Sequence, residues 1–430
     1  MAKKTKQSDQ EELRKALEQS VVDESENSDD DEQDEPKSDR GENQPLPTGP
    51  AKTAKPTGTQ HKEKGDATST DRASDRTAKS TGRQRRRFVI MAVVGLVVLG
   101  GAAGAGVALF GTKPAGTNTT QALPTSGSDL VPRRIDGVLD NPEEQNRYPV
   151  AVMVENHPAS RPQSGLEQAK VVFEALAEGG ITRFLAVYTF NDAVKEIGPV
   201  RSARPYFVDW ARGFNAMYVH IGGSAKALSR ITQLQAFDLN QFFNSQYFYR
   251  DRSREVASEH TLYTTKRLMQ LALLDKDAPK AGDFQAWKFK AEAPASSRPS
   301  SQHLTIDFST FSYKVDYEYD PVTNTYARSL AEQPHVVRDG GQLRPKNVIV
   351  MTVKRRLEQP VDGQGRLEMD TVGEGPVRIF LDGRELVGTW KKASPQDQLH
   401  FYGPDGQPVE LNSGQTWIEA VPPEQGVSVS

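Results

Sequence analysis

The chain has 430 residues, enough for two or three domains, and its charge is nearly balanced, with 54 Lys and Arg against 57 Asp and Glu. It contains no cysteine, which excludes disulfides, thiolate metal sites, cysteine nucleophiles and a lipid-modified cysteine anchor. The charge is unevenly placed, because residues 1–50 carry 7 basic and 15 acidic side chains whereas residues 51–87 carry 11 basic and 4 acidic ones. Segments of this kind bury too little apolar surface to fold, so we predict a disordered cytoplasmic tail over residues 1–87.

Residues 88–110 form an apolar run directly after the basic block. The run has 23 residues without a charge or a proline, so as a helix it would span about 35 Å, against about 30 Å for a hydrocarbon core. Arg83, Arg85, Arg86 and Arg87 precede it, and positive residues stay on the cytoplasmic side of a membrane. We therefore predict a single-pass signal-anchor helix in the cell membrane, with the N-terminus inside and the C-terminal part extracytoplasmic.

Two predictions about partners follow from this N-terminal part. The basic block is explained by its place beside the membrane, so we expect no nucleic-acid partner. Gly100 and Gly104 fall four residues apart, a stripe of small residues that favours helix dimerisation, although small residues are common in membrane helices anyway.

After a flexible linker over residues 111–146, residues 147–274 mix both kinds of element. "YPVAVMVEN" predicts a buried strand, and "VVFEALAEGGITRFLAVYTF" predicts two strands around Gly179-Gly180. "ARPYFVDWARGF" has aromatic residues at helical spacing, "SAKALSRITQL" predicts a helix with Ser224 as its N-cap, and "YTTKRLMQLALL" predicts a third helix. Residues 275–301 have the proline and serine content of a connector, with a short pairing piece at "AWKFK".

Residues 302–422 are rich in strand signals. In "SYKVDYEYD" the apolar and aromatic residues alternate with charged ones, which predicts a half-buried antiparallel strand. "NVIVMTVKRRL", "GPVRIFLDGRELVGTWKK" and "QTWIEAVP" repeat the pattern of strand and turn. The fold class predicted from the sequence is therefore α+β, with a mixed α/β N-terminal half and a β-rich antiparallel C-terminal half.

Several blocks of the sequence resemble a known family. "VAVMVENHPASRPQSGLEQAKVVFEALAEGGITRFLAVY", "IGPVRSARPYFVDWA" and "HIGGSAKAL" resemble signature blocks of the YerB-like family of bacterial envelope proteins, the domain-of-unknown-function 3048 family, and "LNSGQTWIEAVP" resembles its second domain. The resemblance implies an extracytoplasmic, two-part α+β protein with no established catalytic activity. Many relatives are lipoproteins, whereas this chain has an apolar run and no cysteine, and relatives often carry "PHN" where "SEH" stands here.

A cluster of arginines indicates an anion-binding site. Arg201 and Arg204 stand at the entrance of a predicted helix, where guanidinium groups beside free N–H groups suit a phosphate or a carboxylate. Arg161 and Arg183 are candidates to join them. The alternative is structural, with the arginines paired to glutamates inside the fold. On the first interpretation Arg204→Ala weakens polymer binding and leaves the melting temperature nearly unchanged.

The glycine turn of "YVHIGGSAKA" is the second part of the predicted site. Gly222 and Gly223 let a ligand or a backbone approach closely, and the helix that opens at Ser224 offers N–H donors; the alternative is a tight turn with a capping serine. Polar partners of the site are predicted to be Glu155, Asn156, His220 and His260. The histidine spacings match no metal motif, and we expect neither a metal nor a cofactor. The aromatic run "QFFNSQYFYRDRSR" fits either a sugar-binding groove or core packing.

Two functions from different classes agree with these patterns. The first is a membrane-anchored binding or accessory module that engages anionic cell-wall polymer or wall-synthesis proteins. The second is an extracytoplasmic enzyme on cell-wall glycopolymers, in which Arg201 and Arg204 hold a phosphate and His220 or a glutamate moves a proton. Convergence of the predicted residues around an available acid or base favours the enzyme, and arginines used up in buried pairs favour the module.

Overall fold

The computed structural model describes residues 14, 130–358 and 366–430. The predicted tail, the signal-anchor helix at 88–110, the Gly100–Gly104 stripe and most of the linker lie outside the described residues. Within the described part of the chain, no helix has both the length and the apolar character needed to cross a bilayer.

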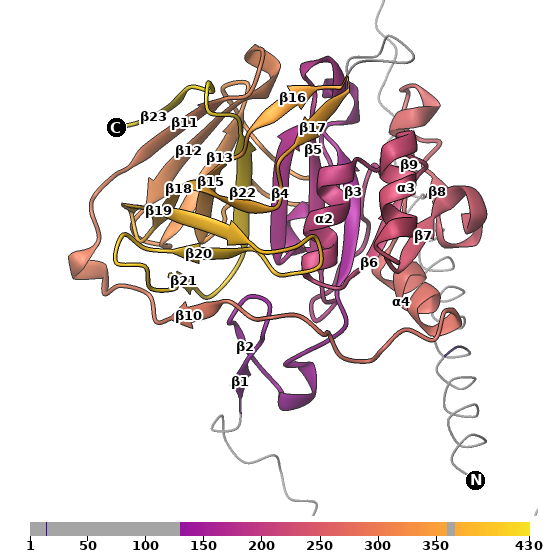
Figure 1. Ribbon diagram of the computed structural model, residues 1–430, viewed down its shortest axis with the longest axis horizontal. Coiled ribbons are helices and arrows are strands. Elements are labelled where there is room, and N and C mark those ends of the chain that lie inside the picture. The colour runs from indigo at the N-terminus through magenta and orange to yellow at the C-terminus, as the bar shows by residue number, and fades with distance from the viewer. Residues whose placement is uncertain (1–13, 15–129, 359–365) are drawn as a thin grey trace, which may run out of the picture. The chain divides into compact units, whose positions relative to one another are not determined.

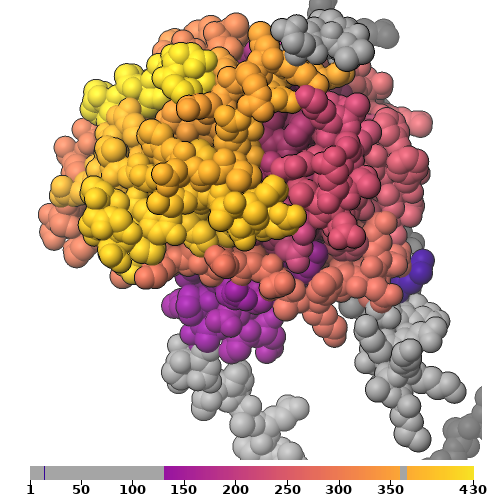
Figure 2. Space-filling view, viewed as in Figure 1, coloured from indigo at the N-terminus to yellow at the C-terminus, as the bar shows by residue number. Residues whose placement is uncertain are grey.

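A mixed sheet of ten strands organises the described residues (Figure 1). Its strands, in spatial order, are β20 (His400–Tyr402), β19 (Arg384–Lys392), β18 (Gly373–Leu381), β15 (Asn347–Thr352), β22 (Thr416–Val421), β4 (Val171–Leu176), β5 (Thr182–Tyr188), β3 (Val150–Glu155), β6 (Met217–His220) and β7 (Asp238–Asn240). The strands from β4 to β7 come from the N-terminal half, and the others come from the C-terminal half. The sheet therefore runs through both halves of the chain, and their surfaces meet directly on the face shown in Figure 2.

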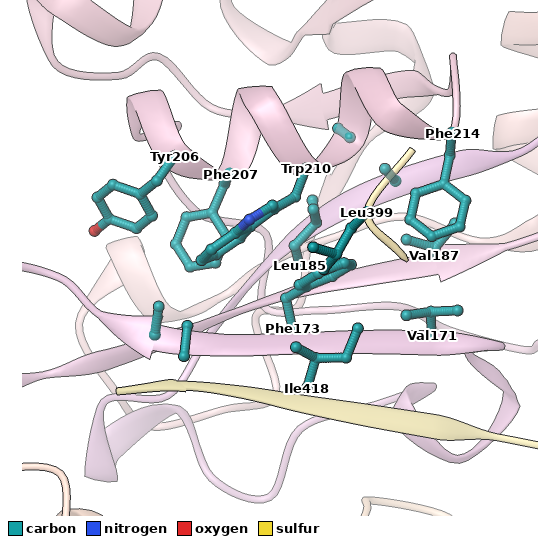
Figure 3. Packing of buried hydrophobic residues seen from close by; sticks show 14 of the residues in the cluster. Val171, Phe173, Leu185, Val187, Tyr206, Phe207, Trp210, Phe214, Leu399 and Ile418 are labelled. Atoms are coloured by element: carbon teal, nitrogen blue, oxygen red, sulfur yellow. The ribbon is translucent and has the colours of Figure 1, made fainter. Parts of the chain in front are cut away.

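Two helices cover one face of this sheet. Helix α2 (Pro205–Gly213) begins at a proline in its first position, which a helix tolerates there, and α3 (Ala225–Gln233) begins after Ser224. The apolar side of α2 points at the sheet, with Tyr206, Phe207 and Trp210 above β4 and β5 (Figure 3). Trp210 stacks on Phe173 of β4 with ring centroids 5.1 Å apart. The helix expected from the spacing of the aromatic residues is thus present, and it is buried over most of its length.

The opposite face of the sheet is covered by α4 (Lys266–Asp275) and by a second, five-stranded sheet. The second sheet has the order β14 (Gln333–Pro334), β13 (Thr325–Leu330), β12 (Lys314–Asp320), β11 (His303–Asp307) and β23 (Val427–Val429). Val315, Tyr317 and Tyr319 of β12 are buried, and the residues between them are at most half-buried. The predicted alternation of β12 is confirmed, because only one of its faces packs against the large sheet.

The C-terminal half is not purely antiparallel, which corrects the predicted fold class. Strand β22 pairs in parallel with β15 on one side and with β4 on the other. All six residues of β22 are buried, as expected for a strand covered on both faces. The mixed character of the N-terminal half and the abundance of strands in the C-terminal half agree with the prediction.

Two segments predicted to be irregular contain ordered structure. Within the expected linker, β1 (Val131–Pro132) pairs with β2 (Leu139–Asp140), and Ile135 between them joins the core because its side chain is apolar. In the connector, β10 (Lys288–Lys290) pairs with β21 (Glu410–Asn412), which is the pairing piece expected at "AWKFK". Two further strand pairs complete the fold: β8 (Tyr249–Arg250) with β9 (Leu262–Tyr263), and β16 (Arg355–Leu357) with β17 (Leu367–Met369).

Candidate functional site

The predicted site residues gather near one edge of the large sheet. Strands β3, β6 and β7 are adjacent and parallel, so their carboxyl ends meet at the same edge. In open sheets of this kind, ligands bind in the loops that follow the carboxyl ends of the strands. Glu155 ends β3, His220 ends β6 and Asn240 ends β7.

Two loops at this edge pair with each other and carry the helix entrances. The Ile221 N–H donates to the Arg201 carbonyl at 3.2 Å, and the Ala203 N–H donates to the Gly222 carbonyl at 3.0 Å. A Cβ added at Gly223 would lie 3.0 Å from the Ala203 Cβ, so the close approach of the loops leaves little room for a side chain there. Ser224 caps α3, since its Oγ accepts the Ala227 N–H at 3.2 Å. The turn-and-cap interpretation of the glycine segment therefore describes its local structure.

Arg204 is held by a carboxylate. Its Nε and Nη2 each lie 2.5 Å from an oxygen of Glu178, in a bidentate ion pair whose side chains are 13% and 21% exposed. Burial alone would raise the pKa of Glu178, but the hydrogen bonds and charge of Arg204 lower that pKa overall. For Arg204 the structural alternative therefore describes the contacts, because Glu178 engages the guanidinium.

Arg183 and Arg161 are also used inside the protein. Arg183 is almost fully buried and donates from Nη1 to the Ser202 carbonyl at 2.7 Å, while burial and then the charge of Arg204 lower the pKa of Arg183 to about 10. Arg161 donates to the carbonyl and the side-chain oxygen of Asn156 at 3.0 and 3.1 Å. Both arginines therefore support the loops behind the edge.

Arg201 is more exposed than Arg183 and Arg204, the other two arginines near the paired loops. Its side chain is 24% exposed, and its Nε lies 3.0 Å from Glu155 Oε1. The other oxygen of Glu155 lies 2.8 Å from His260 Nδ1, and the His260 ring stacks on the ring of His157. The structure thus brings Arg201, Glu155 and His260 together, and it adds His157, which the sequence analysis did not select.

His220 does not join this group. Its Nδ1 lies 2.6 Å from the Gly222 carbonyl oxygen and its Nε2 lies 2.6 Å from Asp238 Oδ1. The residue is fully buried at the end of β6. With both ring nitrogens engaged, His220 holds the glycine turn in place and is not placed to transfer a proton to a ligand.

A buried polar network lies behind the site and joins the two halves of the chain. Arg328 of β13 contacts Glu174 of β4, and its Nε donates to the Tyr317 hydroxyl at 3.1 Å. Glu419 of β22 stands directly opposite Glu174 in the parallel ladder and accepts the Tyr317 hydroxyl. Arg328, Glu174 and Glu419 are each 0% exposed, so their charges must balance within the protein.

The same network reaches the site through His335 and Gln163. Arg328 donates to His335 Nδ1, and His335 Nε2 lies 2.9 Å from Gln163 Oε1. Gln163 in turn donates to the Asn156 side chain at 3.0 Å, and Asn156 donates to Glu174 at 3.2 Å. Burial and then the charge of Arg328 lower the pKa of His335 well below its ordinary value, so the ring is neutral. Its Nδ1 accepts from Arg328 and its Nε2 donates to Gln163 Oε1.

Part of this network had a signal in the sequence. Glu174 and Glu419 each stand in a short apolar run, "VVFEAL" and "TWIEAV", and a charge inside a doubly buried strand needs a partner. No comparable signal marks Arg328, because the alternation in "YARSL" is equally typical of an arginine that faces water. The partner of the two glutamates could not be predicted from local sequence.

The aromatic run after β7 was expected either to line a sugar-binding groove or to pack in the core, and its residues divide between exposed and buried positions. Phe242 and Phe243 are 67% and 82% exposed, whereas Tyr247 and Phe248 are buried. The ring of Phe242 lies against Gly222, where an added Cβ would be 2.6 Å from the ring. The buried residue Asn240 holds the backbone of this segment, because its side-chain oxygen accepts the Gly222 and Phe242 N–H groups at 3.0 and 3.2 Å.

Arg204→Ala is expected to lower the free energy of unfolding by between about 1 and about 3 kcal/mol, because it leaves Glu178 partly buried without its cation. The lowered pKa of Glu178 contributes stability above its unfolded value, and that contribution is lost as the pH falls. The difference between wild type and variant should therefore shrink below about pH 4. Denaturant unfolding of wild type and Arg204→Ala at pH 3.5 and pH 7 measures this difference in the free energy of unfolding.

Arg356→Ala is the matched control for this measurement. Arg356 also pairs with a carboxylate, Glu368 at 2.9 Å, but its side chain is 59% exposed. Its removal should lower the free energy of unfolding by less than about 1 kcal/mol. Equal effects of the two substitutions would contradict a structural role for Arg204.

The fold and the site define a two-part α+β protein in which one sheet joins both parts and a polar site lies at the carboxyl ends of its parallel strands. Residues 136–280 match the family model "Protein of unknown function (DUF3048) N-terminal domain", and residues 304–418 match the model of its C-terminal domain. The chain belongs to this YerB-like family.

A curated relative and a solved structure agree with this assignment. The chain is 30% identical over 309 residues to the protein named "Putative lipoprotein YerB" of Bacillus subtilis (strain 168), covering 69% of this chain and 88% of the relative. It is also similar to the crystal structure of YerB protein from Bacillus subtilis, with a TM-score of 0.62, 30% sequence identity, and coverage of 69% of this chain and 98% of that chain.

Proposed function

We propose that the chain is an extracytoplasmic envelope protein whose folded part binds anionic cell-wall glycopolymer. The printed name of the Bacillus subtilis relative, "Putative lipoprotein YerB", supports a place at the membrane surface. The apolar run at 88–110 supports an anchor of a different kind, a single-pass helix that leaves residues 130–430 outside.

One observation carries the proposal: the segment that leads into α2 carries a half-buried cation, Arg201, and it lies at the same edge as the loop after β7, which carries two exposed aromatic rings. Phe242 lies against Gly222, and the segment 221–224 pairs with the segment 201–204 that carries Arg201. The buried side chain of Asn240 fixes the turn after β7, in which Phe242 and Phe243 are exposed to water. The hydrophobic effect favours burial of both rings, so it does not explain their exposure.

The chemistry of this edge suits a polymer with sugar rings and phosphates. Aromatic faces pack on the apolar faces of sugars, and Arg201 has N–H donors left for an anionic oxygen, since its Nη2 faces only the Glu259 carboxylate at 4.0 Å. Because Arg183 and Arg204 are engaged inside the protein, binding of this kind is favoured over an arginine-lined catalytic cavity.

Phe243→Ala is expected to weaken retention of the full-length chain on immobilised poly(N-acetylglucosamine 1-phosphate) about 3- to 10-fold, the range that loss of one aromatic contact implies. That polymer has a pyranose ring and a phosphodiester in each repeat. Retention should also fall as salt is raised from 50 to 500 mM, because the phosphate contact is screened.

Val322→Ala is the matched control, because Val322 is 86% exposed and its strand pair, β12–β13, belongs to the second sheet. The melting temperature of both variants should equal that of the wild type, since neither side chain is buried. Equal retention of Phe243→Ala and Val322→Ala would contradict a binding role for this edge.

A further inference from the structure

Strands β1 and β2 present a small apolar face to solvent. Pro132 of β1 stands opposite Leu139 of β2, so the two side chains lie on the same face of the strand pair. Leu130 lies two residues before Pro132 and shares that face. Leu130 and Leu139 are 46% and 61% exposed, and Pro132 is exposed as well. The described part of the chain therefore leaves this apolar face open to solvent.

The rest of the β1–β2 segment is fixed to the protein. Arg133 donates from Nε to Asp136 Oδ1 at 2.9 Å, and both side chains are buried. The Asp136 carbonyl accepts the Gly414 N–H at 2.8 Å. Gly137 has a φ of +69°, and a Cβ there would collide with the Phe289 ring, so the turn needs a glycine. Because these contacts hold the segment, the apolar face has a fixed place relative to the large sheet.

That place is the end of the large sheet opposite the proposed polymer site. Lys170 Nζ, just before β4, lies 3.9 Å from Asp136 Oδ2. Asp192 Oδ1, beyond the end of β5, lies 3.8 Å from Arg133 Nη1. The first residues of β3 and β4 pair with the last residues of β5, so these contacts mark the amino ends of β3 and β4. In Figure 1 the pair β1–β2 lies below these strands. The polymer site lies at the carboxyl end of β3, about 20 Å away for a strand of six residues.

The chain brings the apolar face close to the predicted membrane span. The apolar run ends at Phe110, and the 19 residues 111–129 separate it from Leu130. A segment of this length spans about 25 Å as a flexible chain and at most about 65 Å when extended. A short tether gives an effective concentration of about millimolar, so even a weak contact with the bilayer is populated. Three side chains are too few for a protein partner, because each side of a stable interface takes about 20–30 residues.

We infer that the face of Leu130, Pro132 and Leu139 docks on the extracytoplasmic leaflet of the cell membrane, an inference that rests on the proposed single-pass anchor. The apolar side chains enter the boundary between headgroups and acyl chains, as those of interfacial elements do. Docking puts the amino ends of β3 and β4 next to the bilayer. The edge that carries Arg201 and Phe243 then lies about a strand length away from the lipid, on the side where wall polymer is accessible.

A single introduced cysteine tests the contact, because the chain has no cysteine of its own. Full-length Leu139→Cys, labelled with a fluorophore, is reconstituted into phosphatidylcholine vesicles with brominated acyl chains. The label should lose about half of its emission relative to unbrominated vesicles, because the docked face reaches the acyl boundary. Phe311→Cys is the matched control: Phe311 is also 61% exposed, but the carbonyl of its neighbour Ser312 accepts Arg161 Nη2 at 2.9 Å, at the polymer edge. Its label should keep its emission.

Leu130→Asp in the labelled Leu139→Cys chain should restore the emission, because a charged side chain is costly to place among acyl chains. Retention on the vesicles after a wash in alkaline carbonate measures insertion of the anchor. A chain that the wash removes overturns the anchor and the docking together. An inserted chain overturns the docking alone if its Leu139→Cys label is unquenched, if it is quenched no more than the Phe311→Cys label, or if Leu130→Asp has no effect. The anchor and the polymer site then stand.

Discussion

Arg328→Met is expected to lower the free energy of unfolding by about 3–5 kcal/mol, the range for breaking a fully buried ion pair on one side. Methionine fills much of the arginine's volume, so the loss reports charge more than a cavity. Arg328 contacts Glu174, the Tyr317 hydroxyl and His335, and its guanidinium lies 4.6 Å from the Trp417 ring centroid. Its removal leaves Glu174 at 0% exposure without a cation.

The two glutamates beneath Arg328 should respond differently to neutralisation. Burial and then the adjacent Glu174 carboxylate raise the pKa of Glu419 well above its ordinary value, and Arg328 lies closer to Glu174 than to Glu419, so we expect Glu419 to be the member of the pair that holds a proton. We therefore expect Glu174→Gln to cost about 3 kcal/mol and Glu419→Gln less than about 1 kcal/mol at pH 7. Denaturant unfolding of the two isosteric variants compares them directly.

The sign of the pH dependence gives an independent check on Glu419. A carboxyl whose folded pKa is raised contributes stability that is fully present below its unfolded value, about 4.3, and that is lost as the pH rises towards the folded value. Glu419→Gln stays neutral at every pH, so its stability relative to wild type should increase from pH 5 to pH 8. An unchanged difference over that interval, or a cost equal to that of Glu174→Gln, would show that Glu419 is ionised in the folded protein.

Elements whose signals are local in the sequence were predictable. Helix α3 was marked by the spacing of its apolar residues and by Ser224, and the pair of strands around Gly179-Gly180 by two apolar runs and a glycine turn. In each case the deciding interaction joins residues that lie close together in the chain. The insertion of β22 between β15 and β4 was not predictable, because parallel pairing with a distant strand leaves no local pattern beyond a continuous apolar run.

The site was predictable in its residue types and not in its geometry. The sequence analysis selected Arg201 as a ligand-binding candidate and Glu155 and His260 as its polar partners, and the structure brings these three together. The sequence left open the pairing of the arginines with glutamates, but it could not single out Glu178 as the partner of Arg204. Nor could it indicate that Glu155 contacts a histidine 105 residues further along the chain. Such contacts depend on the order of strands in the sheet, which sets the loops that become neighbours.

A fragment of residues 130–301 is expected to lack a cooperative unfolding transition at temperatures where residues 130–430 are folded. The fragment keeps β3 to β7 but loses β22, so β4 becomes an open edge with its N–H and C=O groups unpaired. It also loses Trp417 and Ile418, both fully buried against the N-terminal half, and it leaves Glu174 buried without Arg328. Single domains are stabilised by only about 5–15 kcal/mol, less than the combined loss of a central strand, its core contacts and a buried ion pair.

Adding residues 302–430 in trans supplies the control for this experiment. Because the missing strands complete one sheet and one core, the two fragments should associate and recover a cooperative melt, and Arg328→Met in the second fragment should weaken that association by about 10²- to 10³-fold. If residues 130–301 melt cooperatively by themselves near the temperature of residues 130–430, each half has an independent core. In that case the ten-stranded sheet is a docking surface between two domains, and Arg328 contributes to their association without being required for either fold.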